Sequence, residues 1–411
     1  MKQKTAILVG AGARGQIYAA YARQHPEQLR IVAVAEPKAE RRAVFCHTYG
    51  IDDACQYQDW RELLAQPRMA DAALIATLDD QHTGPAVQAL EKGYHVLLEK
   101  PMSNREEECR AIAAAAQKGG RVLSICHVLR YAPFFLTIKR LIDENVLGEV
   151  ASISLIENVA YWHFAHSFVR GNWRKEEDSS PVILAKSCHD MDILVWLMGR
   201  RCKSVSSFGS LQYFDAAHAP AGAPLRCSDG CPHSAACPYE ARKLYLTGST
   251  EWPVDMLTTD LTPSGIEKAL REGLYGRCVY HCDNDVADRQ VVNLEFEGGG
   301  VASFTLTAFT GDCTRMIRIT GTGGDLEGNL EANRLVLHRF GEDAREIEVP
   351  LPEETNTYGH AGGDYYLMRD FLQAIDGQAE KNATDAQVSL QSHLICFAAE
   401  KSRRENRVIS L

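Results

Sequence analysis

The chain has 411 residues, of which 45% are hydrophobic and 24% are charged, a globular composition long enough for roughly two or three packed units. Its net charge of −10 leaves no basic surplus for nucleic-acid phosphates or an anionic membrane, so we expect neither partner. The sequence contains neither the ~18 consecutive apolar residues of a membrane helix nor a secretory signal pattern, and we therefore expect a cytoplasmic protein.

Residues 1–126 alternate short apolar runs with helical segments. The runs read TAILVGAG, RIVAVAE, DAALIAT, HVLLEK and RVLSICH. Runs that are apolar on both faces and separated by helices indicate a parallel sheet covered on both sides. We therefore predict an α/β chain whose N-terminal domain, 1–126, is a doubly wound Rossmann sheet.

From residue 127 onward the pattern changes to alternating strands, such as EVASISLIEN and RQVVNLEFEG. This pattern predicts an α+β domain over 127–357 with an open, mainly antiparallel sheet. Within it, about 212–285 form an insertion rich in Cys, Pro, Asp and Gly. Residues 358–411 contain two helical patterns, which we expect to pack back on the body of the protein.

The first strand leads into a glycine-rich turn, Gly10-x-Gly12-x-x-Gly15, and then into a helix. In this context glycines let the backbone approach a pyrophosphate, although they also serve ordinary strand-helix turns. The second strand ends in Glu36, about where an acid binds the adenosine ribose. A carboxylate there favours NAD over NADP. Arg14, a basic residue beside the loop, could still help to hold a phosphate, so NADP stays an alternative cofactor.

Three further motifs follow the glycine turn. They are Ile75-Ala76-Thr77 leading to His82, Glu99-Lys100-Pro101 at the end of the fifth strand, and His189-x-x-Asp192 in a later helix. Together the motifs resemble the glucose-fructose oxidoreductase, inositol dehydrogenase and rhizopine-catabolism (Gfo/Idh/MocA) family across essentially the whole chain. The predicted cofactor contacts are Gly10, Gly12, Ala13, Arg14, Gly15, Glu36, Thr77, His82, Glu99 and Lys100.

The resemblance also implies the catalytic residues. Lys100 would lie beside the substrate hydroxyl, at the sheet edge where doubly wound folds bind ligands. His189 would exchange the hydroxyl proton, a role that suits a side chain with a pKa near ~6.5. The alternatives are a solvated surface lysine and a histidine satisfied in the core.

This sequence departs from the usual family pattern near His189. Relatives commonly carry an aspartate four residues earlier, where this chain has Ala185. Lys186 and Asp190 are the candidate replacements. His127 stands where asparagine is frequent, and adds a titratable group to the expected site. We therefore add Lys186 and His127 to the catalytic candidates.

The segment 161–174 is dense in aromatic, histidine and arginine side chains that can stack on a sugar ring and hydrogen-bond its hydroxyls. The same residue types are also enriched at oligomer contacts. His360 is a weaker candidate of the same kind. The predicted substrate contacts are Arg130, Tyr131, Tyr161, His163, His166, Arg170, Trp173, Arg174 and Asp190.

Five of the thirteen cysteines are clustered in the insertion. The spacing Cys227-x3-Cys231-x5-Cys237, with Cys278-x3-Cys282 further on, suits a structural zinc held by four thiolates. We take Cys227, Cys231, Cys237 and Cys278 as the ligands, with Cys282 as the alternative fourth. An iron-sulfur cluster, free thiols and disulfides are the competing interpretations.

These features predict an NAD-dependent oxidoreductase acting on a secondary hydroxyl of a sugar, glycoside or cyclitol, with C3 as the favoured carbon. The first alternative is a redox-cycling glycosidase, in which a transient ketone permits elimination of the aglycone. The second is a dinucleotide sensor without catalysis, which would not need Lys100 and His189 together. An open sheet face also leads us to expect a homo-oligomer, either a dimer or a tetramer.

Overall fold

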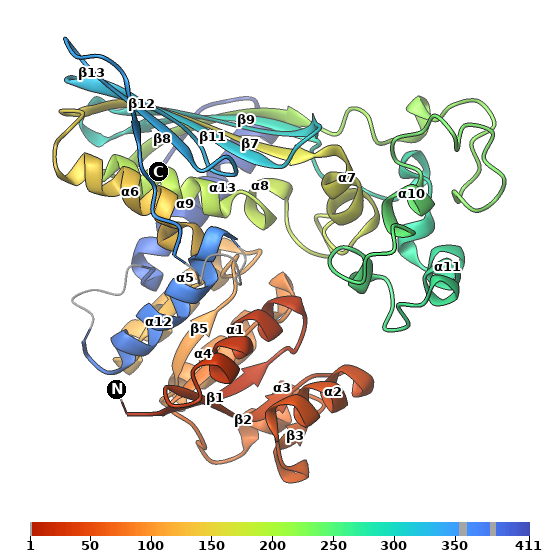
Figure 1. Ribbon diagram of the computed structural model, residues 1–411. Helices are drawn as coiled ribbons and strands as arrows, with labels where there is room; N and C mark the ends of the chain where they lie inside the picture. The colour runs from red at the N-terminus through yellow and green to blue at the C-terminus, as the bar shows by residue number, and fades with distance from the viewer. Residues whose placement is uncertain (1, 353–359, 379–383) are drawn as a thin grey trace.

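The computed structural model describes residues 2–352, 360–378 and 384–411. Two sheets form the framework, one at each end of the molecule (Figure 1). The predicted boundary between residues 357 and 358 lies outside the described residues. In the described part of the chain, no helix is long and apolar enough to cross a membrane.

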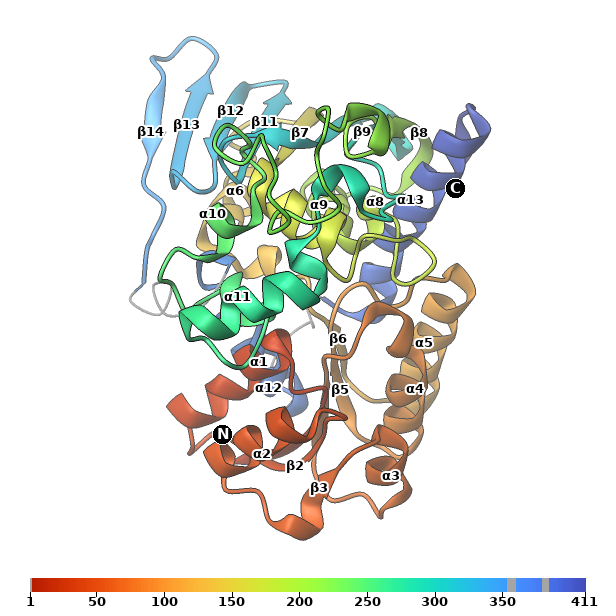
Figure 2. The ribbon, with the colours of Figure 1, turned by 90° about the vertical axis from the view of Figure 1, so that its right-hand side faces the viewer.

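The N-terminal sheet has six parallel strands in the order β3-β2-β1-β4-β5-β6. Its strands are β1 (Lys4–Val9), β2 (Leu29–Ala35), β3 (Gln56–Tyr57), β4 (Ala72–Ile75), β5 (His95–Leu98) and β6 (Leu123–Ile125). The covering helices are α1 (Ala13–Gln24), α2 (Ala39–Tyr49), α3 (Trp60–Ala65), α4 (Thr83–Glu91) and α5 (Glu106–Gly119). Helices cover both faces of the sheet (Figure 2), and a separate apolar core lies on each face, so the predicted doubly wound parallel sheet is confirmed.

The second sheet has nine strands in the order β14-β13-β12-β11-β7-β10-β9-β8-β15. They are β7 (Val150–Ala160), β8 (Cys202–Ser210), β9 (Arg289–Phe296), β10 (Val301–Thr310), β11 (Thr314–Gly321), β12 (Gly324–Asn329), β13 (Arg334–Arg339), β14 (Arg345–Ile347) and β15 (Ile409–Ser410). Among the strand pairs of the described residues, β7 and β10 are parallel and the others are antiparallel. The predicted, mainly antiparallel sheet is therefore confirmed.

One face of the nine-stranded sheet is covered by helices that lie between it and the Rossmann sheet (Figure 1). They are α6 (Pro133–Asp143), α8 (Val182–Ala185) and α9 (Cys188–Met198). Along β7, Ile153 and Leu155 are buried beneath this layer, whereas Ser154 and Ile156 point to the other face and are exposed. This alternation places the core on one side and leaves the outer face open.

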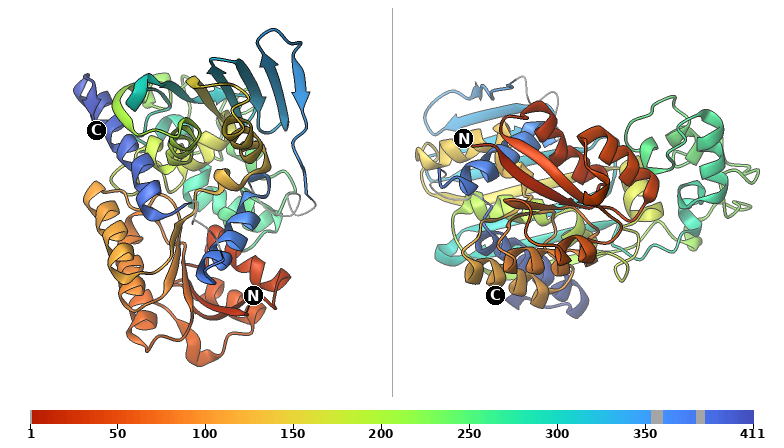
Figure 3. Two further views of the ribbon diagram at one scale, coloured as in Figure 1. Left: turned by 90° about the vertical axis from the view of Figure 1, so that its left-hand side faces the viewer. Right: turned by 90° about the horizontal axis from the view of Figure 1, so that it is seen from below.

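The two C-terminal helices pack against the body, one on each side of the Rossmann sheet (Figure 3). Helix α12 (Gly363–Ile375) contacts α1, while α13 (Ala386–Glu405) contacts α5, α9 and β8. The chain then adds β15 to the edge of the nine-stranded sheet beside β8. The C-terminal segment therefore connects both domains, and the final strand was not foreseen from the sequence.

The cysteine-rich insertion, which we call the lobe, runs from residue 211 to 288, between β8 and β9. It projects beside the sheet next to α7 (Tyr161–Phe164) (Figure 1). It contains short helices, α10 (Ala241–Tyr245) and α11 (Pro263–Glu272), around a small apolar core that includes Tyr245 and Leu270. The lobe also reaches the Rossmann domain, where the Thr259 hydroxyl lies 3.4 Å from the Glu40 carboxylate.

Candidate active site

The glycine turn leaves room for a ligand on one side only. Gly10 has a φ of +90°, and a Cβ there would lie 2.6 Å from the carbonyl oxygen of Ala76. A Cβ on Gly15 would lie 2.1 Å from the oxygen of Gly10, so glycine permits close packing of α1 against β1. Gly12 has only Arg41 nearby, at 3.8 Å. The backbone around Gly12, where α1 begins without a side-chain cap, is therefore accessible to a phosphate.

Glu36 lies at the end of β2 and is held against this turn. Its Oε2 accepts a hydrogen bond of 2.9 Å from the N–H of Ala11, and its Oε1 accepts one of 3.0 Å from the N–H of Lys38. Arg41 Nη1 lies 3.8 Å from the same carboxylate. The side chain is buried, and the two bonds fix it beside the glycine turn, where an acid binds ribose hydroxyls in this fold.

Arg14 is engaged by two carboxylates. Its Nε lies 2.5 Å from Glu99 Oε1, and its Nη2 lies 2.5 Å from Asp364 Oδ1 on α12. Burial raises the pKa of Asp364, but the charges of Arg14 and His360 outweigh burial and hold that pKa well below its usual range. Arg14 therefore joins α1, the end of β5 and α12, and a contact with the cofactor phosphate stays a prediction.

His82 braces the loop after β4 against the loop after β5. Its Nδ1 lies 2.6 Å from the carbonyl oxygen of Pro101, and its Nε2 lies 3.2 Å from that of Thr77. The ring is buried. Thr77 and His82 thus fix two adjacent loops at the carboxyl edge of the sheet, the edge where doubly wound folds bind their ligands.

Lys100 connects the two domains. Its Nζ donates a hydrogen bond of 2.6 Å to the carbonyl oxygen of Ala185, at the end of α8. Its own N–H donates to Glu99 Oε2 at 2.7 Å. Because Ala185 precedes His189 by four residues, this bond holds the lysine next to the start of α9.

His189 lies in the first turn of α9, and only 5% of its surface is exposed. Within the described residues its Nδ1 has no hydrogen-bond partner. The rings of His127 and His360 lie 5.8 and 5.9 Å from its ring, centre to centre. Burial lowers the pKa of His189 well below 6.5, and the charge of Lys100 lowers it further. The imidazole is therefore neutral near pH 7 and able to accept a proton.

Behind His189, His127 is buried against a fixed ion pair. Arg130 donates to both oxygens of Asp192, from Nε at 2.5 Å and from Nη2 at 2.7 Å. His127 Nε2 lies 3.8 Å from Asp192 Oδ1. Burial, followed by the charges of Arg130 and Lys100, holds the pKa of His127 well below 6.5. Arg130 thus supports Asp192 of the His-x-x-Asp motif, and its predicted substrate contact is untested.

A second buried charge cluster surrounds the other two candidates on this side. Lys186 Nζ lies 3.1 Å from Glu157 Oε1, and Arg315 Nε lies 2.8 Å from both Glu157 Oε2 and Asp190 Oδ1. Burial raises the pKa of Asp190 to about 6, although Arg315 opposes the rise. Glu157 and Arg315 were missed because each occupies one position in an ordinary strand pattern; only a charged residue at an inward-facing position could have signalled them.

Two predicted substrate residues contact other parts of the protein. The hydroxyl of Tyr131 donates to Asp370 on α12 at 2.7 Å. The indole N–H of Trp173 donates to Asp79, in the loop after β4, at 3.4 Å. Trp173 therefore lies beside the cofactor edge of the Rossmann sheet, while Tyr131 holds α12 in place.

His163 and His166, from the helical segment after β7, face the lobe. The ring of His163 lies 4.9 Å from the ring of Trp252. His166 Nδ1 lies 3.0 Å from the hydroxyl of Tyr245, and its ring stacks on Tyr275 at 4.7 Å. Burial, followed by the charge of Arg170, lowers the pKa of His166 to about 3. The lobe thus covers this segment.

The remaining members of the segment also contact the lobe. The rings of Tyr161 and Tyr239 lie 5.8 Å apart. Arg170 is completely buried and donates to the carbonyl oxygen of Tyr239 at 2.7 Å, whereas Arg174 pairs with Asp283 at 2.9 Å. Arg170 and Arg174 therefore anchor the lobe, and their predicted contacts with substrate stay predictions.

The predicted zinc site is not formed as a coordination site. In residues 2–352, 360–378 and 384–411, no group of three or more His, Cys, Asp or Glu side chains is positioned to hold a metal ion. Cys227, Cys231, Cys237 and Cys278 nevertheless line one small cavity. Cys282 does not line it and instead donates to the carbonyl oxygen of Cys278 at 3.3 Å.

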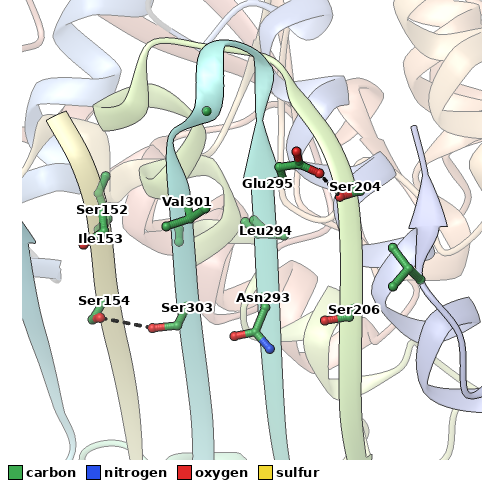
Figure 4. Close-up of a pocket in the computed structure, with 13 residues that line it drawn as sticks. Ser152, Ile153, Ser154, Ser204, Ser206, Asn293, Leu294, Glu295, Val301 and Ser303 are labelled. Carbon is green, nitrogen blue, oxygen red and sulfur yellow. Dashed lines mark hydrogen bonds between the residues drawn. The ribbon is translucent and has the colours of Figure 1, made fainter. Parts of the chain in front are cut away.

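A shallow groove of about 600 Å³ lies on the outer face of the nine-stranded sheet. Ser154, Ser303 and Asn293 point into it, and the hydroxyls of Ser154 and Ser303 are hydrogen-bonded at 3.1 Å (Figure 4). Lys100 and His189 do not line this groove. The groove is therefore a feature of the open sheet face and lies outside the catalytic constellation.

The fold and the site together define a class of protein. The Rossmann domain has an accessible glycine turn, and the α/β domain brings a histidine to the same sheet edge as a lysine. This is the architecture of an NAD(P)-dependent oxidoreductase acting on CH–OH groups. Residues 4–127 match a family model described as "Oxidoreductase family, NAD-binding Rossmann fold", and residues 139–411 match "Oxidoreductase family, C-terminal alpha/beta domain". The chain belongs to this Gfo/Idh/MocA oxidoreductase family.

Relatives of known sequence agree with this assignment. The chain is 25% identical to "Putative oxidoreductase YteT" of Bacillus subtilis over 74% of this chain and 73% of that protein. It is 28% identical to "Inositol 2-dehydrogenase 2" of Saccharopolyspora erythraea, over 32% of this chain and 35% of that protein. It is also 25% identical to "2,7-anhydro-N-acetylneuraminate hydratase" of Mediterraneibacter gnavus, over 44% of this chain and 46% of that protein.

Solved structures share the fold over the whole chain. A levoglucosan dehydrogenase in complex with NADH and L-sorbose superposes with a TM-score of 0.74 at 19% identity, covering 100% of this chain and 99% of that one. The WlbA dehydrogenase from Bordetella pertussis, in complex with NADH and UDP-GlcNAcA, gives 0.70 at 18% identity, covering 100% and 98%. At these identities the likeness establishes the two-domain fold.

Proposed function

We propose that the protein oxidises a secondary hydroxyl of a sugar, glycoside or cyclitol with NAD, or catalyses the reverse reduction, with C3 as the favoured carbon. The observation that carries this proposal is the bond between Lys100 Nζ and the carbonyl oxygen of Ala185, at 2.6 Å. It joins the end of β5 to the segment that leads into His189. A lysine and a histidine from separate domains are thereby held at one edge of the cofactor domain.

The two side chains divide the chemistry. The Lys100 ammonium donates a hydrogen bond to the substrate oxygen and stabilises the negative charge that develops there. The neutral His189 imidazole accepts the hydroxyl proton as the C–H bond releases its hydride. Bound NAD supplies the hydride acceptor, nicotinamide C4. His127, behind His189, and Lys186, beside it in sequence, are proposed as supporting groups.

The surroundings of the site favour a polyhydroxylated substrate. His163, Trp173 and other members of the 161–174 segment supply aromatic faces and polar groups between the cofactor edge and the lobe. Several relatives are named for such compounds, including inositol and levoglucosan, and one solved relative holds L-sorbose. These names support the class of substrate and do not identify the sugar.

One observation favours a second candidate, the redox-cycling lyase or glycosidase. Elimination needs a base for the C–H next to the transient ketone, besides the group that handles the hydroxyl proton. His127 and His189 lie 5.8 Å apart, and burial lowers the pKa of both, so both are available as bases at neutral pH. One relative of this chain is named a hydratase and not a dehydrogenase.

Three further proposals concern cofactor, location and assembly. Glu36 beside the glycine turn favours NAD, while Arg41 close by is the cation available to pair with the 2′-phosphate of NADP. Thirteen free cysteines suit a reducing cytoplasm.

We propose that the outer face of the nine-stranded sheet pairs with a second copy, since Phe208, Val301 and Met316 are exposed on it by 63%, 47% and 46%.

The experiment for the proposed function is a panel of free sugars, glycosides and cyclitols incubated with the protein and NAD. NADH absorbance and product mass are followed together. NADH with a product two hydrogens lighter supports the dehydrogenase. Aglycone release without net NADH supports the redox-cycling candidate. A panel without turnover of either kind contradicts both.

A further inference from the structure

The lobe gathers four cysteines around one cavity. Cys227, Cys231, Cys237 and Cys278 line a space of about 20 Å³, close to the size of a single water-sized sphere. Backbone pairing brings the distant Cys278 to the others. The N–H of Cys227 donates to the oxygen of Gly276 at 3.0 Å, and the N–H of Cys278 donates to that of Leu225 at 2.9 Å.

Other potential ligands that line this cavity already have partners. His233 Nε2 lies 2.8 Å from the carbonyl oxygen of Ala221. The Glu240 carboxylate accepts from the N–H of Lys243 at 2.9 Å and from Arg242 Nε at 2.7 Å, capping α10. The four sulfurs and the Nδ1 of His233 are therefore the ligand groups that remain on its wall, and the sulfurs alone are enough for a tetrahedral site.

A buried cation next to the cavity lacks a counter-charge. Arg170 is completely buried, donates to the carbonyl oxygens of Arg277 and Tyr239 at 2.7 Å each, and lies with Nη2 3.8 Å from the sulfur of Cys227. Within the described residues these contacts are to uncharged groups, and its Nη1 has no hydrogen-bond partner. A buried guanidinium without negative charge nearby is costly.

We propose that the cavity binds a structural zinc ion held by the thiolates of Cys227, Cys231, Cys237 and Cys278. Zn²⁺ displaces the four thiol protons, so the site carries two net negative charges, which Arg170 partly balances. Binding would draw the four sulfurs to the ~2.3 Å of a Zn–S bond, because within the described residues they are not positioned to hold a metal ion.

The ion would fix the lobe, because its ligands come from both ends of it. Tyr245 and Tyr275, on the lobe, contact His166 of the 161–174 segment. If the proposed function holds, zinc would therefore stabilise one wall of the substrate site and take no part in the hydride transfer. Four protein ligands leave no open position for substrate.

The test is the metal content of protein purified without chelators and then incubated with one equivalent of zinc sulfate. We expect about one zinc per chain in the wild type and in Cys282→Ser, whose cysteine lies outside the cavity. We expect Cys231→Ser to release zinc at a chelator concentration about tenfold lower or less. Circular dichroism confirms that each variant is folded.

Several outcomes would overturn the proposal. They are a wild type without zinc after incubation, iron with acid-labile sulfide in its place, or fewer than thirteen titratable thiols in denatured, unreduced, chelated protein. Loss of zinc from Cys282→Ser with retention in Cys231→Ser would also overturn it. None of these measurements needs a substrate, so a failed zinc proposal is distinguishable from a failed proposed function.

Discussion

The Nζ atom of Lys100 donates a hydrogen bond of 2.6 Å to the carbonyl oxygen of Ala185. Ala185 occupies the position, four residues before His189, where the family resemblance leads us to expect an aspartate. In this chain the lysine is thus held by the backbone, while the carboxylates of Glu157 and Asp190 are paired with Arg315. The site therefore keeps the lysine and histidine in place with a different charge arrangement.

Replacing Lys100 tests its role at the substrate oxygen. We expect Lys100→Met to lower kcat/KM by about 10²- to 10⁴-fold, because the developing alkoxide loses its cationic donor. NAD binding, followed by quenching of tryptophan fluorescence, should change little. The control is Lys118→Met on the exposed face of α5, which should behave as wild type. Full activity in Lys100→Met would remove the lysine from the mechanism.

His189 predicts a pH dependence with a definite sign. Burial and the charge of Lys100 lower its pKa, so the neutral, proton-accepting form persists as the pH falls below 6.5. Oxidation should therefore decline only at a pH below 6.5. The rate of His189→Asn should fall by about 10²- to 10⁴-fold, and its pH–rate profile should no longer show the decline on the acid side. His47→Asn, on the surface, should keep both the wild-type rate and the acid-side decline. An acid-side decline in rate with its midpoint above pH 6.5 would contradict the lowered pKa of His189.

Glu36 is expected to set the cofactor preference. Glu36→Gln removes the negative charge that would face a 2′-phosphate, while Arg41 stays close by. The ratio of kcat/KM for NADP to that for NAD should rise by about tenfold, the equivalent of ~1.4 kcal/mol. Glu91→Gln, at the exposed end of α4, is the control. An unchanged ratio would mean that Glu36 has only a structural role.

Arg14 is expected to stabilise the junction of the two domains. Arg14→Leu leaves the buried carboxylates of Glu99 and Asp364 without their cation, which should cost about 3 kcal/mol in urea unfolding at pH 7. Both carboxylates have a lowered pKa when folded. Their contribution is therefore present above about pH 4, the unfolded value, and is lost as the pH falls further.

A surface pair provides the matched control for Arg14. Arg61 and Asp59 form an ion pair at 3.0 Å in which both side chains are largely exposed. Arg61→Leu should cost less than about 1 kcal/mol. If the two variants lose similar stability, or if the loss in Arg14→Leu does not shrink in acid, the Arg14 junction is not an effective ion pair.

The open sheet face predicts self-association. Met316→Glu places a charge on the exposed face of β11 and should shift the molar mass measured by light scattering toward the monomer. Val388→Glu, which is similarly exposed but lies on α13, should leave the mass unchanged. A wild type that is already monomeric at micromolar concentration would contradict the proposed assembly.

Local patterns predicted the two sheets because strands and helices have short sequence periods. The glycine turn and Glu36 were also predictable, since their spacing lies within one βαβ unit. The Arg315 cluster was not, because its members come from β7, α9 and β11 and meet only after folding. The same applies to Arg14, whose partner Asp364 lies 350 residues away. The domain boundaries and site roles remain predictions.

The central claim is that hydride moves between nicotinamide C4 and a sugar carbon at the Lys100–His189 site. The most direct measurement incubates the protein with ketosugars and NADH deuterated at both C4 positions, then locates deuterium by mass spectrometry and NMR. We predict one deuterium on the reduced sugar carbon, with at least about 10²-fold slower transfer in His189→Asn. Absence of deuterium from every sugar tested, or equal transfer by His189→Asn, would contradict the account.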